Sequence, residues 1–512
     1  MVPRRSQKPV EITAKMSDYQ RVRSEDERRF GYLVVSDLHI QEAEHSPTGR
    51  LFYFDEEFSD FLQYYLDGRP RRLIINGDFV EFYHIPVRPD PADPLLAGVT
   101  LYPTDFKFFP GTEWQKSVWK LDVALKGHPR LLRTLARFLA AGNEIHMIRG
   151  NHDLEFCWPQ VQEHFRRRIA QHPPEGFTAE EMEAITRSRI TFHPWFYYEP
   201  GLLYVEHGHQ YDGYCSNAHN LHPVLPGNDR RMELPISALS MRYFGSRITI
   251  VDPIAMENVN SIPRYIWRLI RTNPRQVIRM PFYYLEMAYR ILSKITRPAG
   301  ALDAAVASVA AERRDEIVKR FGLDAETLGR IEGLAERPII RDLMTSLRCT
   351  LIDLVALGLF GIAVAVVGWA LGVAGPGGWV GAGIVILVLL LLLAGKHRMS
   401  KINDHRNLRD IARRIREIIG VRYVVFGHSH DPDLMPFAPS GNGAYFNVGT
   451  WMPRQGIGQF IYFELHVEAG SPTARLMRWD REKPADVGTA IAERAHSLRE
   501  AALDAMTGRG TA

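Results

Sequence analysis

The stretch Val424-Val425-Phe426-Gly427-His428-Ser429-His430 is a short apolar run that ends in a glycine and two histidines. Its β-branched and aromatic residues are typical of a buried strand. Because glycine allows the backbone to turn sharply where the strand ends, both imidazoles can be presented at the edge of a sheet. The stretch therefore predicts a buried strand that carries two side chains able to bind a metal.

Four other apolar runs of the chain end in the same way, with Asp, His or Asn following closely. They are residues 32–39, 73–78, 145–153 and 202–209. In open α/β sheets, binding sites form beyond the carboxyl ends of the strands. These strand endings can therefore converge on one site, although they are spread over most of the chain.

Length and composition place the chain among globular proteins. It has 512 residues, of which 46% are hydrophobic and 24% charged. A formal net charge of +4 is too small to indicate nucleic acid as a partner. Cys157, Cys215 and Cys349 have no paired spacing, so neither a disulfide framework nor a thiolate metal site is expected, which fits a reducing compartment. Residues 1–30 are polar and charged, and we expect a mobile arm rather than a secretory signal.

The order of patterns along the chain predicts one α/β domain that is interrupted by an insertion. In residues 31–229, strands alternate with stretches of helical periodicity such as 55–65 and 131–139, which favours an α/β fold in layers. Strand patterns return in residues 397–480. We expect these two segments to form one domain together, with residues 481–512 as a C-terminal tail that is helical or frayed.

Residues 230–348 are expected to form a helical insertion. Between residues 263 and 298, basic side chains, among them Arg264, Arg268 and Arg271, stand against the single acid Glu286 and alternate with aromatic and aliphatic residues. This composition is typical of an amphipathic segment that lies in a membrane interface and contacts lipid headgroups. The alternative is a solvated helical insertion whose arginines pair with acids elsewhere.

Residues 349–396 are expected to form a transmembrane or re-entrant hairpin. Residues 354–373 give about 20 uncharged positions, enough to cross a hydrocarbon core of roughly 30 Å, and a second apolar run follows a Gly-Pro-Gly-Gly turn. Arg348 before the hairpin and Lys396 after it predict that both ends face the cytoplasm. The α/β domain would then lie on the cytoplasmic side of the inner membrane. A buried hydrophobic pair of helices is the alternative.

The polar side chains at the strand endings are candidate metal ligands. They are Asp37, His39, Asp78, Asn151, His207, His428 and His430. Imidazole and carboxylate groups without cysteine suit manganese, iron or zinc and disfavour a structural zinc site. The set is too large for one ion, and a carboxylate can bridge two, so it fits two ions roughly 3.5–4 Å apart. Each residue alone has an ordinary explanation, such as a turn at Asp78 or a helix cap at Asn151, but their joint occurrence favours a metal site.

The motifs Asp-x-His, Gly-Asp, Gly-Asn-His-Asp, His and Gly-His-x-His, in this order, resemble those of the calcineurin-like metallophosphoesterases. The resemblance covers the ligand strands from Asp37 to His430, without the insertion. It implies an αββα sandwich with two divalent ions, manganese being expected first and iron, zinc or a mixed pair being alternatives. One ion would be held by Asp37, His39 and His430, the other by Asn151, His207 and His428, with Asp78 bridging. A hydroxide between the ions would be the nucleophile.

The same resemblance assigns roles around the metals. His152 would lie near the leaving oxygen as general acid or charge stabiliser, with Asp153 orienting it, while Glu81 receives no role. Asn447, Gly449 and Trp451 resemble an element that supports the site. His209 and His84 are expected to line the pocket, whereas His146 lies in the middle of a strand and is expected to be structural.

The stretch Gly77-Asp78-Phe79-Val80-Glu81-Phe82 and the basic, aromatic insertion look similar to the UDP-2,3-diacylglucosamine pyrophosphatases. That similarity implies hydrolysis of a phosphoester or pyrophosphate bond in a lipid-linked substrate at the cytoplasmic membrane face, with membrane lipids as partners. The alternatives are a membrane-tethered phosphoesterase for a soluble nucleotide or phosphoprotein, and a metal-binding scaffold without turnover. A homo-oligomer is left open.

Overall fold

A seven-stranded sheet, in the order β12-β11-β10-β1-β2-β3-β4, contains the first three of the strands that end in polar side chains. The computed structural model describes residues 30–42, 54–85, 87–225, 231–247, 271, 273–295, 300–342, 344–346, 407–438, 443–452, 458–468 and 471–494. In this sheet four neighbouring strands run parallel, namely β1 (Gly31–Val35), β2 (Arg71–Asn76), β3 (Glu144–Ile148) and β4 (Ile190–His193). Antiparallel strands complete it beside β1, namely β10 (Ile461–Glu468), β11 (Ser471–Asp480) and β12 (Lys483–Asp486). β12 lies in the range that was expected to be a helical or frayed tail.

A five-stranded sheet, in the order β5-β6-β7-β9-β8, joins the two halves of the domain. Its strands are β5 (Phe196–Glu199), β6 (Leu203–Glu206), β7 (Tyr423–Phe426), β8 (Asp433–Pro436) and β9 (Ala444–Asn447). β6 runs parallel to β7, and β7 runs parallel to β9. The chain before the insertion thus pairs directly with the chain after it.

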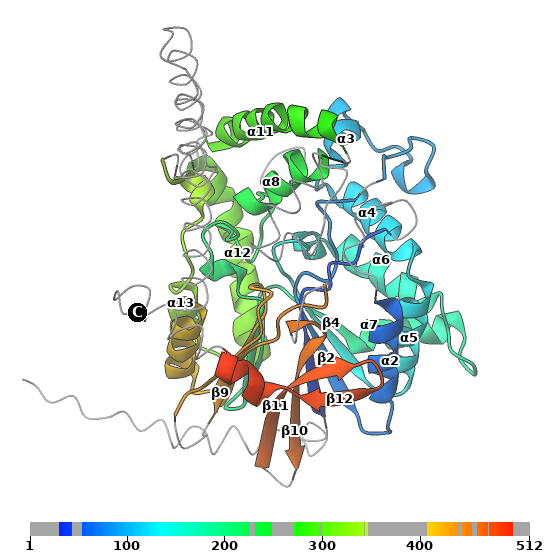
Figure 1. The fold of residues 1–512 in the computed structure, drawn as a ribbon, viewed down its shortest axis with the longest axis vertical. Helices are drawn as coiled ribbons and strands as arrows, with labels where there is room; N and C mark the ends of the chain where they lie inside the picture. The colour runs from blue at the N-terminus through cyan, green and yellow to red at the C-terminus, as the bar shows by residue number, and fades with distance from the viewer. Residues whose placement is uncertain are drawn as a thin grey trace, which may run out of the picture.

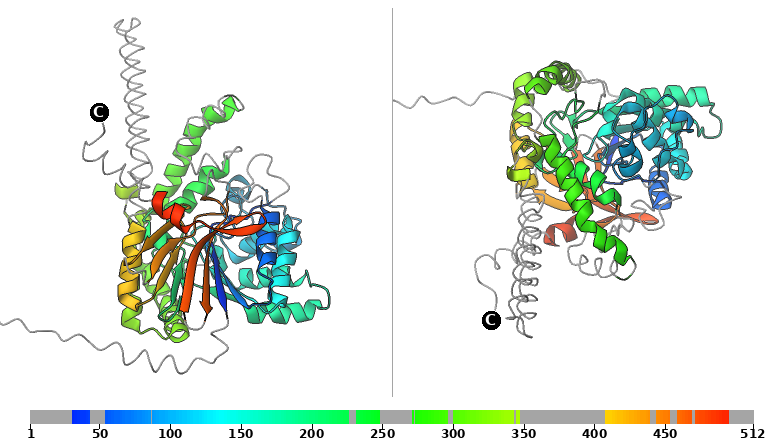
Figure 2. Two further views of the ribbon diagram at one scale, coloured as in Figure 1. Left: turned by 60° about the horizontal axis from the view of Figure 1, so that its bottom comes forward. Right: turned by 90° about the horizontal axis from the view of Figure 1, so that it is seen from above.

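The two sheets pack face to face between two layers of helices (Figures 1 and 2). Val34 and Ile74 from the larger sheet share one buried cluster with Val205 and Val425 from the smaller sheet. On the outer face of the larger sheet lie α2 (Asp55–Tyr64), α4 (Trp114–Lys126), α5 (Pro129–Ala140), α6 (Pro159–Ala170) and α7 (Ala179–Arg189). The smaller sheet is covered by α12 (Gly300–Phe321), α13 (Ala325–Glu332) and a helix over residues 407–419.

Further helices gather at one end of the sheets. α3 (Pro103–Phe108), α8 (Ile236–Tyr243) and α11 (Pro274–Ile295) lie together at the top of Figure 1. Leu239 of α8 and Ile291 of α11 belong to the same buried cluster as the helices on the larger sheet. Short 3-10 helices occur at η2 (Pro94–Leu96), η3 (Leu154–Cys157), η4 (His209–Tyr211), η5 (Gly245–Arg247) and η7 (Ile339–Arg341).

Local sequence explains where several helices begin. α5 has a proline at its first position, where the missing N–H costs no helical hydrogen bond. α7 begins with a capping box, in which the Thr178 side chain accepts from the Glu181 N–H and the Glu181 side chain accepts from the Thr178 N–H. The apolar face of α5, including Leu131, Leu135 and Leu139, is buried against the sheet.

The prediction of a membrane-spanning hairpin as part of the fold, and with it a place in the cytoplasmic membrane, is wrong. Among the described residues, no helix has both the length and the apolar character needed to cross a membrane. α11 and α12 are each 22 residues long, but charged side chains such as Arg279, Glu286 and Arg313 interrupt them. What the structure contains is a mixed α/β fold with two sheets. Residues 349–396, where the hairpin was placed, and residues 1–29 of the predicted arm lie outside the described residues.

Candidate metal centre

The carboxyl ends of strands from both sheets meet at one edge and are tied together there by hydrogen bonds. The Asn76 side chain, at the end of β2, donates to the Glu206 carbonyl at the end of β6 over 2.9 Å. His207 Nδ1 lies 2.8 Å from the Asn76 carbonyl oxygen. Because a carbonyl can only accept, Nδ1 carries the proton, and in the neutral ring Nε2 is left free to bind a metal. The His428 N–H, after β7, donates to Asp37 Oδ2, after β1, over 3.1 Å.

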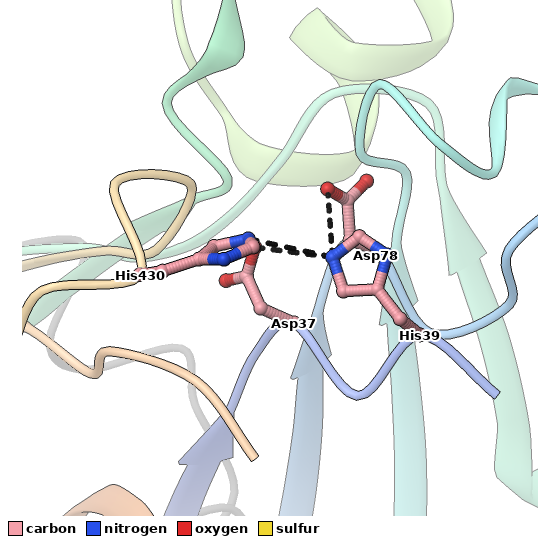
Figure 3. A group of neighbouring side chains, drawn as sticks. All are labelled: Asp37, His39, Asp78 and His430. Atoms are coloured by element: carbon pink, nitrogen blue, oxygen red, sulfur yellow. Dashed lines mark hydrogen bonds and ion pairs between the residues drawn. The ribbon is translucent and has the colours of Figure 1, made fainter. Parts of the chain in front are cut away.

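Four of the predicted ligands form one compact group, and Figure 3 shows their side chains facing one another. His430 Nε2 lies 2.9 Å from Asp37 Oδ1 and 3.4 Å from His39 Nε2. His39 Nε2 is also 3.6 Å from Asp78 Oδ2. The ligand atoms of this group all lie within 4.8 Å of one another. The group could therefore hold a metal ion.

Through His207, Asp78 is also linked to the remaining predicted ligands. Its Oδ2 atom lies 3.3 Å from His207 Nε2, and that nitrogen lies 3.2 Å from Asn151 Oδ1. The ring of His428 is centred 5.3 Å from the ring of His207. One carboxylate oxygen of Asp78 thus contacts His39 on one side and His207 on the other. All seven predicted ligands lie in one connected cluster.

The backbone at this cluster is unusual. A positive φ is uncommon for residues other than glycine and costs conformational free energy, and such strain gathers at functional sites. Most of the predicted ligands have it: Asp37 (57°), His39 (50°), Asp78 (51°), His428 (65°) and His430 (55°). Because five of the seven predicted ligands share this conformation, the strain supports a functional role for their side chains.

Motif glycines allow the loops to approach this closely. A Cβ atom on Gly150 would lie 2.1 Å from Asp78 Oδ1, and one on Gly427 would lie 2.1 Å from Ser36 Oγ. Real contacts of a Cβ atom are longer than 3.0 Å. A side chain at either position would push apart the loops that carry the ligands.

The charges of the carboxylates and imidazoles in the cluster act on one another. Burial opposes ionisation of Asp78, but the nearby His207 and His152 hold its pKa well below the usual range. Burial likewise opposes the charge on Asp37, while His430 and His207 lower its pKa. Burial would lower the pKa of His207, yet Asp78 and Asp37 raise it to about 9. Two ionised carboxylates therefore depend on imidazolium protons that a bound cation would replace.

Glu81, rather than Asp153, is the carboxylate that contacts His152. His152 Nδ1 lies 2.6 Å from Glu81 Oε2, and the His152 N–H donates to Asp78 Oδ1 over 2.8 Å. Asp153 instead accepts from the backbone N–H groups of Phe79 and Gly150, over 2.8 and 2.6 Å. Asp153 therefore joins the loop after β2 to the loop after β3, whereas Glu81 is the carboxylate in position to orient His152.

Asp212 is a functional candidate that sequence reasoning missed. Its Oδ2 atom lies 3.3 Å from His428 Nε2. Together with Cys215 and His428 it forms a further group that could hold a metal ion. Burial opposes its charge, but the hydrogen bond from His428 lowers the pKa of Asp212. Asp212 follows a 3-10 helix rather than a strand, so the pattern that identified the other residues did not include it.

The remaining predicted histidines, His209, His84 and His146, have different surroundings. His209 is buried beside His207 and His428, with ring centroids 5.4 and 6.4 Å away, and neither of its ring nitrogens has a hydrogen-bond partner among the described residues. His84 packs against Gln41, whose side-chain nitrogen is 3.1 Å from His84 Nδ1. His146 contacts His193 within the larger sheet.

Asn447 and Trp451 stabilise the loops that carry the ligands. The Asn447 side chain donates to the Gly427 carbonyl over 2.7 Å and accepts from the Gly449 N–H over 3.0 Å. The Trp451 N–H donates to the Asp37 carbonyl over 3.2 Å, and the indole is buried. Arg271 is exposed, while Arg264 and Arg268 lie outside the described residues.

The chain thus contains residue groups that could hold a metal ion, built at the joined edges of two sheets. Comparison with models of known protein families and with curated proteins finds no match to this sequence.

Proposed function

We propose that the protein is a metal-dependent phosphohydrolase that uses two divalent ions to cleave a phosphoester or pyrophosphate bond. The observation that carries this proposal is the position of Asp78 Oδ2, which lies 3.6 Å from His39 Nε2 and 3.3 Å from His207 Nε2. A carboxylate between two sets of imidazoles is suited to bridge two cations. Manganese is the first metal to test, because mixed nitrogen and oxygen donors without thiolate suit it.

The donor set fits a pair of cations. Asp37, His39 and His430 would hold one ion, and Asn151, His207 and His428 would hold the other. Once the His207 ring is neutral, Nε2 has the lone pair that a ligand needs, because Nδ1 faces a carbonyl oxygen and keeps its proton. When bound, two such ions would lower the pKa of a water to supply the attacking hydroxide and would neutralise the charge of the phosphate.

His152 is placed to handle a proton beside this donor set. Its ring is centred 4.8 Å from the ring of His39. Burial opposes its charge, but Glu81 and Asp78 raise the pKa of His152 to about 9. A protonated imidazole at neutral pH can give its proton to the leaving oxygen as the bond to phosphorus breaks. We therefore assign His152 as the general acid, with Glu81 as its positioning residue.

A hydrolysis assay tests the proposal. The purified chain is depleted of metal, reloaded with Mn²⁺ and given a generic aryl phosphodiester, an acylated UDP-sugar and its deacylated analogue. We expect turnover that depends on metal, and a faster reaction of the acylated sugar would support the substrate class suggested by the resemblance. Asp78→Asn should remove activity, whereas Asp67→Asn, on an exposed loop, should retain it.

The assay also separates the enzyme from a scaffold. If the chain bound two metal ions per molecule and hydrolysed none of these substrates, a metal-binding scaffold would replace the proposed enzyme. Equal rates for the acylated and deacylated sugars would favour a soluble nucleotide as the substrate.

A further inference from the structure

A cavity of about 360 Å³ lies beside the larger sheet, among β4, α6 and α12. Arginines from separate parts of the chain line it: Arg149, Arg166, Arg187, Arg313 and Arg320. Among the described residues of its wall, Glu316 is the single carboxylate. Phe192 and Phe321 form part of the same wall. We call this cavity the arginine pocket.

Arg149 is a buried cation that forms no ion pair with a carboxylate in the part of the chain that the structure describes, although the charge of Asp153 acts on it. It is 4% exposed. Its Nε atom donates to the Pro194 carbonyl over 3.2 Å, and Nη2 donates to the Asn220 carbonyl over 2.8 Å. Nη1 is buried with no hydrogen-bond partner among the described residues. Burial raises the pKa of the neighbouring Cys157 thiol to about 12, so that thiol does not supply a negative charge.

The other arginines are only partly neutralised by carboxylates, since Arg187 also lies 3.7 Å from Glu183 Oε2. Arg187 Nη2 lies 2.8 Å from Glu163 Oε1, and Arg166 shares the same carboxylate at 3.7 Å. Arg313 Nη1 lies 2.8 Å from Glu316 Oε2. Arg320 donates to the Phe192 carbonyl over 3.3 Å. Guanidinium groups therefore outnumber carboxylates around the pocket.

We propose that the arginine pocket binds a small anion that carries two or more phosphate groups. A guanidinium matches two phosphate oxygens at once, and several of them around one cavity suit a ligand with several charges. A buried charge such as that of Arg149 is costly unless it is paired, and the anion would supply the missing partner. The volume is within the range of small-molecule sites.

The arginine pocket goes beyond the proposed hydrolysis, because its lining residues are separate from the candidate metal ligands. The two sites share one loop, since Arg149 directly precedes the Gly150-Asn151-His152 segment after β3. Anion binding there should therefore persist when the metal centre is empty. This gives the pocket a test that does not depend on hydrolysis.

Calorimetric titration of the full chain with pyrophosphate, in the presence of a chelator, measures this binding without metals. We expect pyrophosphate to bind more tightly than inorganic phosphate. A chain with both Arg313→Gln and Arg320→Gln should bind pyrophosphate at least about tenfold more weakly, because charge-assisted hydrogen bonds are lost. Both side chains are partly or fully exposed, so folding should be retained.

Two further variants sharpen the result. Arg168→Gln is the matched control, because Arg168 lies on α6 near Arg166 in the sequence but contacts Asp122 and Gln171. The Arg168→Gln chain should bind pyrophosphate as tightly as the wild type. Glu316→Gln should tighten binding a few-fold, since it removes the carboxylate of the wall. The proposal is overturned if the wild-type chain does not bind pyrophosphate, if phosphate binds equally well, or if the double variant binds like the wild type.

Discussion

His152 Nδ1 lies 2.6 Å from Glu81 Oε2, and this same oxygen lies 3.3 Å from His39 Nδ1. Glu81 is fully buried and its second oxygen accepts from the Tyr83 N–H over 2.9 Å. Burial opposes its charge, yet His152 and His39 hold the pKa of Glu81 far below its usual range. One carboxylate therefore connects the candidate general acid to a candidate metal ligand. The influence of the Glu81 charge on catalysis can be tested by substitution.

Removing that charge should change the pH profile of hydrolysis. In Glu81→Gln the shape of the side chain is kept, but the largest influence that raises the pKa of His152 is lost. The alkaline limb of kcat/KM should therefore move to lower pH. His152→Ala should lower kcat by about 10²-fold, the usual contribution of a general acid. Glu183→Gln, on the exposed face of α7, is the control. An unmoved alkaline limb would show that Glu81 does not set the protonation of His152.

The number of metal ions bound per chain should depend separately on each half of the ligand cluster. His430→Ala removes a ligand of one predicted ion, and His207→Ala removes a ligand of the other, so each should lower the metal content toward one ion per chain. Asp78→Asn should weaken the binding of both ions, because Asp78 Oδ2 contacts His39 and His207. Elemental analysis after dialysis measures this. His164→Ala, whose side chain pairs with Asp122 on the far helix layer, should retain the wild-type content.

If His430→Ala and His207→Ala lost both ions equally, the cluster would be a single site rather than two. If neither lost metal, the group at Asp212, Cys215 and His428 would become the better candidate.

Gly427→Ala should lower metal affinity although it replaces none of the predicted metal ligands. The added Cβ would lie 2.1 Å from Ser36 Oγ and 2.8 Å from Asp37 Oδ2, so the loop with His428 and His430 must move away from Asp37. We expect at least a tenfold weaker affinity, as for other changes that displace ligands. Gly329→Ala in α13 is the control, since its Cβ would meet Arg314 at an ordinary 3.6 Å. Unchanged affinity in Gly427→Ala would mean that the loop spacing has no role.

Strand endings were predictable because two independent physical signals coincide there. An apolar run such as residues 423–426 must be buried, and a polar side chain directly after it must lie at the sheet edge. This placed Asp37, Asp78 and His207 correctly at one edge, although they come from two different sheets. The division into two sheets was not visible in those runs, because the pairing partner of a buried strand is set by tertiary contacts rather than by its own pattern.

Side chains on irregular segments were harder to predict. Asp212 lies after a 3-10 helix, and Glu81 lies in a loop, where no periodicity reports which way a side chain points. The contacts of Asp153 could not be predicted for a related reason. Both Asp153 and Glu81 are near His152 in the sequence or in space, and only the fold decides that Asp153 accepts backbone N–H groups while Glu81 contacts the imidazole.

The histidine pair of β3 and β4 should make the protein less stable in mild acid. His146 Nδ1 lies 2.9 Å from His193 Nε2, a geometry that needs one neutral acceptor nitrogen. Burial, then the charges of His146 and Arg320, lower the pKa of His193 well below 6.5, and burial lowers the pKa of His146. The folded pair therefore binds fewer protons than the unfolded chain once the pH falls below about 6.5.

The sign of the pH dependence follows from these directions. A depressed folded pKa of a base means that its contribution to stability is complete above the unfolded pKa and is lost as the pH falls. The free energy of unfolding, measured by urea denaturation, should drop between about pH 6.5 and pH 5.5 by on the order of 1–2 kcal/mol for this pair. His193→Gln should reduce that slope. Phe321→Leu removes the ring stacked on His193 at 5.9 Å but no titrating group, so it should lower stability at both pH values and leave the slope unchanged. An equal slope in wild type and His193→Gln would exclude the pair as the source of acid sensitivity.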